Sequence, residues 1–81
     1  MSLMGSVLEK IKNGNVVVEY IGNNCLPIRG IDHDEIKVFN IAKKEVFFTP
    51  TIIGKNELMP EQWFIKLSNN GMEYLNNYEQ N

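Results

Sequence analysis

The sequence predicts an α+β fold in which helices precede a β-hairpin and one further helix follows it. Three observations lead to this fold class. Apolar residues recur at three- and four-residue spacing between residues 3 and 11, which indicates an amphipathic helix. Segments 46–53 and 63–67 are rich in β-branched and aromatic residues, which indicates two strands. Ser68 then stands where a helix N-cap is expected, ahead of a second apolar stripe.

Length and composition favour one small domain that spans residues 1–81. The apolar fraction of 43% is enough for one compact core, and a chain of 81 residues gains stability from association, so a homodimer is one expected state. No apolar run approaches the ~20 residues that cross a bilayer. The single cysteine, Cys25, cannot form an internal disulfide, which predicts a cytoplasmic location. Two methionines within four residues suggest that residues 1–3 are a cloning addition ahead of Met4.

The first half of the chain contains one clear helix and two ambiguous segments. The N-terminal helix ends at Asn13-Gly14, a common helix stop. Residues 16–21 are β-branched like a strand, but their apolar positions also fit one face of a short helix, and both alternatives stay open. Asp32, three residues before Glu35, fits a capping box and favours a helix over residues 32–44. A strand through residues 36–41 is the rival interpretation.

The second half is predicted to form a hairpin followed by a helix. Pro50 lacks a backbone donor, so the strand at residues 46–53 should have an edge position there. Residues 54–60 form a polar loop, and residues 63–67 alternate as a second strand. Met72, Leu75 and Tyr78 then fall on one helical stripe.

The segment Phe64-Ile65-Lys66-Leu67-Ser68-Asn69-Asn70-Gly71-Met72-Glu73-Tyr74-Leu75 resembles the end of the wing in winged-helix (winged helix-turn-helix) domains of the small bacterial or prophage type. The resemblance implies that Ser68 caps the final helix, that Gly71 allows close backbone packing and that Leu75 returns to the core. It also implies that residues 30–46 hold the recognition helix and that residues 54–60 are the tip of the wing.

A winged-helix domain is expected to act as a regulatory or nucleic-acid-binding module on double-stranded DNA. The candidate contacts are one polar and five basic residues: Arg29, Lys37, Asn40, Lys43, Lys44 and Lys55. The turn Asp32-His33-Asp34-Glu35 opposes this function, because its three carboxylates would lie where a recognition helix approaches phosphate. The net charge of −2 opposes it as well. The alternative is therefore a protein-interaction or homodimeric assembly module that binds no DNA.

Other chemistry has little support in the sequence. His33 sits among acids in one helical turn, where side chains do not converge on a metal, and no second His or Cys completes a ligand set. Cys25 has no evident base partner. Aromatic residues of the two strands could stack on single-stranded nucleic acid, but core packing is the favoured interpretation: Phe47, Phe48, Trp63 and Phe64. We therefore expect no enzyme activity, cofactor, metal or small-molecule substrate.

An alternative fold is a small β-rich, barrel-like sheet flanked by terminal helices. In this alternative residues 16–21, 25–31, 36–41 and 46–53 are consecutive antiparallel strands, separated by turn signals. The state of residues 32–44 distinguishes the two folds.

Overall fold

The computed structural model describes residues 2–78 and has the predicted α+β class. Within these residues the helices are α1 (Leu3–Lys12), α2 (Ile36–Lys44) and α3 (Asn69–Tyr78). The strands are β1 (Val17–Ile21), β2 (Asn24–Arg29), β3 (Phe48–Thr51) and β4 (Gln62–Leu67). Two single turns of 3-10 helix, η1 (His33–Glu35) and η2 (Lys55–Glu57), precede α2 and β4 respectively. Of the segment interpreted as a cloning addition, Met1 lies outside the described residues, while Ser2 caps α1 by accepting a hydrogen bond from the Gly5 N–H.

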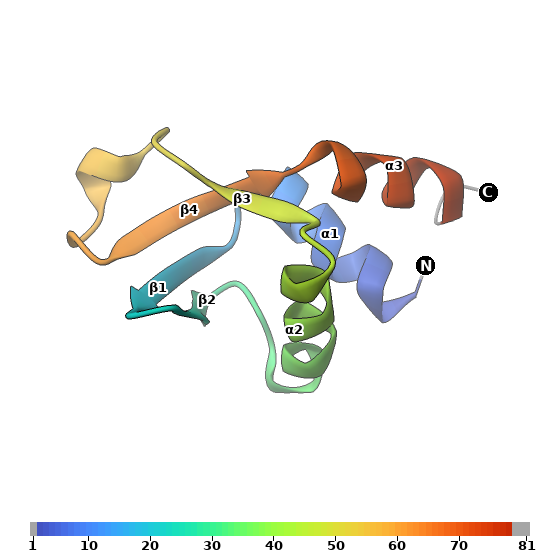
Figure 1. Ribbon diagram of the computed structural model, residues 1–81, viewed down its shortest axis with the longest axis horizontal. Helices are drawn as coiled ribbons and strands as arrows, with labels where there is room; N and C mark the ends of the chain where they lie inside the picture. The colour runs from blue at the N-terminus through green and yellow to red at the C-terminus, as the bar shows by residue number, and fades with distance from the viewer. Residues whose placement is uncertain (1, 79–81) are drawn as a thin grey trace.

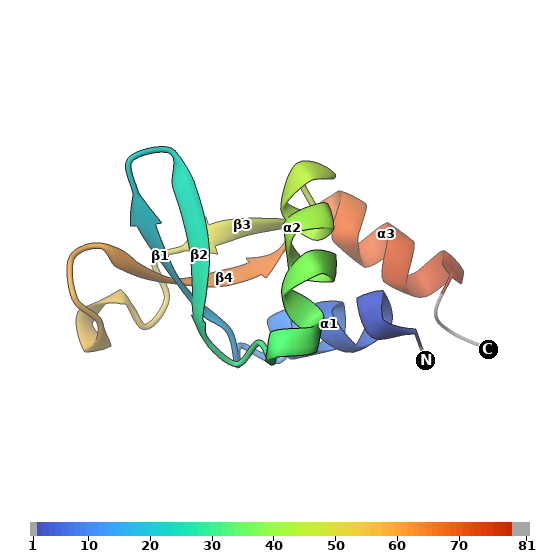
Figure 2. The same cartoon turned by 90° about the horizontal axis from the view of Figure 1, so that it is seen from below.

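The strands form one open antiparallel sheet in the order β2-β1-β4-β3 (Figure 2). β1 and β4, far apart in sequence, pair at the centre and join the two hairpins into one sheet. β2 and β3 are the edges and do not pair with each other, so the sheet is not closed and the barrel-like alternative is wrong. The predicted edge position at Pro50 is confirmed, since β3 pairs only with β4.

The first ambiguous segment is a strand. β1 turns at Gly22 and Asn23 into β2, which the winged-helix interpretation did not predict as a strand. Val16 and Val18 point into the core, and Val17 is equally buried on the opposite face of the strand. A helix here would pair with neither β2 nor β4, so pairing within the sheet selects the strand. One consequence is that a hairpin separates α1 from α2.

Residues 36–44 are helical, so the predicted helix is confirmed and a strand through residues 36–41 is wrong. The end signals explain the choice, because the Glu35 carboxylate accepts a hydrogen bond from the Asp32 N–H at 2.9 Å, as in a capping box. Phe39 and Ala42 are fully buried three residues apart, which is the spacing of a helical face.

The strand predicted at residues 46–53 is shorter than expected. Val46 and Phe47 complete the end of α2: the Val46 N–H bonds to the Lys43 carbonyl and the Phe47 N–H to the Ala42 carbonyl, the pair of bonds of a Schellman motif. β3 therefore begins at Phe48. At the other end Ile52 and Ile53 leave the sheet for the loop.

α3 begins as the capping pattern predicts. Ser68 Oγ accepts from the Gly71 N–H at 3.1 Å and donates to the Val46 carbonyl at 2.6 Å, which ties the start of α3 to the end of α2. A Cβ atom on Gly71 would overlap the carbonyl oxygen of Phe47, so this helix can approach that backbone only with glycine here. Leu75 is buried one turn further on.

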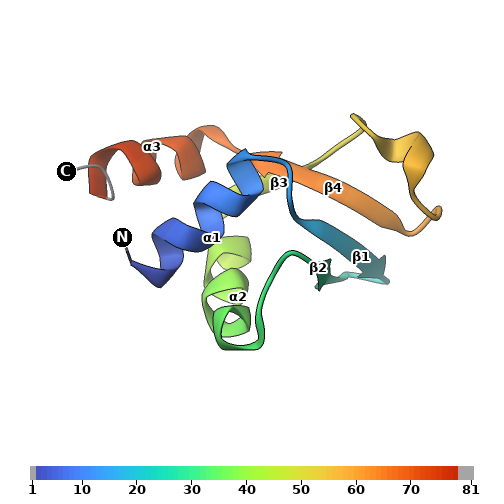
Figure 3. The same ribbon diagram turned by 180° about the vertical axis from the view of Figure 1, so that it is seen from behind.

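The molecule is elongated, with principal extents of 38 × 24 × 19 Å. The three helices gather at one end, while the sheet extends away from them to the loop that contains η2 at the other end (Figures 1 and 3). The core lies where helices and sheet meet, and its buried side chains come from every helix and all four strands: Val7, Leu8, Ile11, Val16, Val18, Cys25, Phe39, Ala42, Phe48, Ile65 and Leu75. None of the helices in residues 2–78 has the length and apolar character needed to span a membrane.

Candidate functional site

The predicted nucleic-acid contacts divide into three groups. Lys37, Asn40 and Lys44 are exposed on one face of α2, because their spacing of three and four residues places them on successive turns. Lys43 is exposed beside that face. Arg29 is exposed at the end of β2, on an edge strand of the sheet rather than on a helix.

Lys55 has an internal role instead. Its ammonium donates hydrogen bonds to the carbonyl oxygens of Met59 and Pro60, each at 3.0 Å. It also lies over the Trp63 ring, 4.6 Å from the centroid, in a cation–π contact. These contacts join the beginning of the loop to its end and to β4, so Lys55 stabilises the loop.

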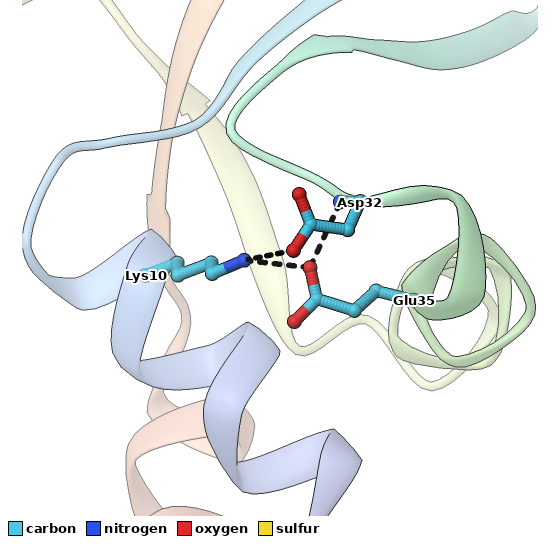
Figure 4. A network of polar contacts seen from close by, with 3 residues as sticks. All are labelled: Lys10, Asp32 and Glu35. Carbon is cyan, nitrogen blue, oxygen red and sulfur yellow. Dashed lines mark hydrogen bonds and ion pairs between the residues drawn. The ribbon is translucent and has the colours of Figure 1, made fainter.

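The acidic turn before α2 is partly neutralised within the fold (Figure 4). The Lys10 ammonium, on α1, lies 2.6 Å from Glu35 Oε1 and 3.6 Å from Asp32 Oδ2. Glu35 is only 5% exposed, whereas Asp34 and His33 are exposed. Of the three carboxylates expected to face a partner, Glu35 is therefore turned inward and Asp32 is paired, while Asp34 faces solvent.

The charges of Lys10 and Glu35 stabilise one another. Burial alone would raise the pKa of Glu35, but the hydrogen bonds from Lys10 and from the Asp32 N–H outweigh it and lower that pKa. The hydrogen bond to Glu35 raises the pKa of Lys10. Both groups are thus charged at neutral pH, and the arrangement is a tether between α1 and the start of α2 rather than a proton-transfer pair.

Cys25 lies opposite Tyr20 in the β1–β2 ladder and is buried. Burial raises the pKa of the Cys25 thiol, although a hydrogen bond with Tyr20 and the charge of Lys43 act in the other direction. Burial and then the neighbouring thiol raise the pKa of Tyr20 to about 12. This is the environment of a packed, protonated thiol and not of a reactive thiolate. Among residues 2–78 no group of three His, Cys, Asp or Glu side chains is placed to hold a metal ion.

The aromatic residues considered as a stacking platform are distributed over different parts of the molecule. Phe48 is in the core and stacks on Phe39, with 4.9 Å between ring centroids. Phe47 packs on Tyr74 of α3. Trp63 lies beneath Lys55 and Phe64 against Gly54, both near the loop. They do not form a single exposed platform.

The residues that sequence reasoning missed are in the loop. Ile52, Ile53 and Met59 are 80%, 77% and 62% exposed. We call these three side chains the apolar loop surface. The sequence predicts residues 52 and 53 in a strand, where apolar side chains are expected to be half covered. The strand ends before them, at Thr51, and the signals for this end were Pro50 at an edge position and Gly54 in the loop.

Fold and surface together define a small α+β domain with an open four-stranded antiparallel sheet and, at the end opposite the helices, a braced loop that exposes Ile52, Ile53 and Met59. No family model, characterised protein or solved structure matches this chain.

Proposed function

We propose that this chain is a protein-interaction module, without enzymatic activity, that contacts its partner through the apolar loop surface. The observation that carries this proposal is the exposure of Ile52, Ile53 and Met59 within eight residues of the chain. Exposed apolar side chains scattered singly are ordinary, but three of them in one loop at one end of the molecule favour a contact site.

The bracing of the loop supports the same function. Lys55 makes two hydrogen bonds and a cation–π contact within the loop and β4, and Ile53 N–H donates to Thr51 Oγ1 at 3.2 Å. A loop that is already ordered loses less conformational entropy when it binds. Aliphatic side chains held in place on such a loop suit the centre of an interface, which polar residues surround.

The test replaces all three side chains by serine: Ile52→Ser, Ile53→Ser and Met59→Ser. Because these side chains are exposed, the melting temperature should stay within a few degrees of the parent value, since exposed substitutions usually change stability by about 0.5 kcal/mol or less. Association should fall at least about tenfold, as expected for the loss of hot-spot contacts. The matched control is Leu26→Ser with Ile28→Ser, two exposed apolar residues on β2.

Association is measured in two ways. Sedimentation of the purified chain detects a second copy as the partner, and a photo-crosslinking residue at position 53 detects another protein in an extract of the source cells. Equal association of the triple variant and the parent, or equal crosslinking from positions 53 and 26, would refute the proposal.

A winged-helix type of regulatory module that binds double-stranded DNA is the second candidate. It is supported by the exposed face of α2, where Lys37, Asn40 and Lys44 stand together, and by the inward position of Glu35. The hairpin between α1 and α2 argues against a helix-turn-helix arrangement, in which two helices follow one another. Fluorescence anisotropy with a labelled duplex at low salt tests it: Lys37→Ala with Lys44→Ala should weaken binding and flatten its salt dependence.

A cytoplasmic location is part of the proposal. It rests on Cys25, whose buried thiol needs no disulfide partner for the fold.

A further inference from the structure

The structure contains a groove between the end of α1 and the loop. It has a volume of about 390 Å³, within the range of roughly 300–1,000 Å³ that small-molecule sites occupy. We call it the Phe64 groove. Ile11 and Ile65 line it and are almost fully buried, so they form its base, while the exposed Ile53 stands at its mouth. The lining is mostly apolar.

The glycines of the wall keep the groove open. Gly54 packs directly on Phe64, since a Cβ atom there would come within 2.7 Å of the ring. Gly14 lines the other side without a side chain. Gly54 covers one side of the Phe64 ring, and the rest of this half-buried side chain lines the groove.

The charged side chains that line the groove determine which charge of ligand it favours. Lys12 and Lys66 line it and are exposed, and Glu57 is the acidic residue among the lining side chains. Two ammonium groups against one carboxylate leave a net positive charge beside an apolar base. An apolar molecule with an anionic end matches this distribution, because its body leaves water while its charge stays near the lysines at the solvent boundary.

We propose that the Phe64 groove binds a small organic acid with an aliphatic or aromatic body and a single carboxylate. The body lies against Phe64 above the base of the groove, and the carboxylate lies toward Lys12 and Lys66. This site goes beyond the proposed protein contact, with which it shares only Ile53.

The experiment titrates the ¹⁵N-labelled chain with three probes that share one apolar body: 4-phenylbutyrate, 4-phenylbutanol and 4-phenylbutylamine. The amide signals of Gly14, Thr51 and Gly54 report on the groove, because these residues line it. We expect saturable shifts there, with the acid binding about threefold to tenfold more tightly than the alcohol and the amine binding most weakly, as two exposed charges warrant. The preference should shrink at high salt.

Three variants test the role of the charges without touching the base of the groove. Lys12→Gln with Lys66→Gln should remove the preference for the acid, and Glu57→Gln should strengthen acid binding, since it removes the opposing charge. Lys37→Gln on α2, which is exposed and does not line the groove, is the control and should change neither. Dispersed amide spectra of each variant show that it is folded.

Absence of saturable shifts at Gly14, Thr51 and Gly54 up to millimolar probe would overturn the proposal. Equal affinities for the three probes would overturn the assignment of an acid. Neither result bears on the protein-interaction proposal, because these titrations use the isolated chain and leave Ile52 and Met59 unchanged.

Discussion

At the scale of single residues, two helix ends with the same hydrogen-bond pattern differ in one side chain. α1 and α2 both end in a Schellman motif, with Gly14 at the left-handed position of the first and Val46 at that of the second. Gly14 has φ 75° and Val46 has φ 57°. A β-branched residue in this conformation is strained, and Val46 is 55% exposed, so little burial compensates for the strain.

Replacing Val46 by glycine should therefore stabilise the protein. Relief of the left-handed strain outweighs the extra freedom of glycine in the unfolded chain, and we expect a gain of about 0.5–1 kcal/mol in the free energy of unfolding. Urea unfolding followed by circular dichroism measures it.

The matched control is Gly14→Ala, because a Cβ atom at Gly14 meets nothing within 4 Å and only the backbone term changes. That variant should lose about 1 kcal/mol. A Val46→Gly variant less stable than the parent would mean that the valine side chain makes a contact that matters more than its backbone strain.

At the scale of elements, the Lys10–Glu35 ion pair connects α1 to the turn that starts α2. Its two ends are 25 residues apart in sequence, and Glu35 also accepts the Asp32 N–H, so one carboxylate both starts a helix and joins it to another. Lys10→Met keeps the apolar stem but leaves the buried carboxylate with the Asp32 N–H as its remaining donor. We expect a loss of about 1–3 kcal/mol at neutral pH.

This loss should depend on pH in a defined direction. The pKa of Glu35 is lowered in the folded state, so the pair stabilises the protein above the ordinary carboxyl value of 4.5 and its contribution disappears as pH falls through the folded pKa. The pKa of Lys10 is raised, so the contribution is also lost as pH rises beyond 10.5. Urea unfolding at neutral pH and below pH 4 measures the difference between parent and Lys10→Met, which should narrow on acidification. Lys37→Met is the control, and a pH-independent difference would contradict this role of the pair.

At the scale of the whole molecule, an open sheet exposes two edges, and each edge strand contains a proline. Pro27 lies in β2 and Pro50 in β3, while β1 and β4 at the centre contain none. Because proline lacks a backbone donor, it interrupts the ladder that a second chain could add to an edge. The two prolines thus disfavour association through the sheet edges.

Pro27→Thr with Pro50→Thr should therefore increase self-association through the edges. Static light scattering over a concentration series should show a higher average mass than for the parent, with an unchanged far-ultraviolet spectrum that confirms the native fold. Pro60→Thr, in the exposed loop, is the control for the general effect of losing a proline. A double variant that matches the parent in mass at every concentration would show that the prolines do not protect the edges.

The sequence by itself determined what short-range physics controls. The periodicity of residues 3–11, the cap at Ser68 and the capping box at Asp32 and Glu35 correctly predicted three helices, because each signal depends on neighbours within one or two turns. The hairpin of β3 and β4 was predicted because two segments rich in β-branched and aromatic residues follow one another with a single loop between them.

Tertiary structure decided the rest. Residues 17–21 pair with β2, the next segment of the chain, and residues 17–19 also pair with β4, more than 40 residues away, a partner that no local signal contains. Lys10, which is 25 residues from Glu35 in the sequence, likewise holds that carboxylate inside the fold. Charge and apolarity could be read from the sequence, but whether a side chain is paired, buried or free depends on residues that only the folded chain brings together.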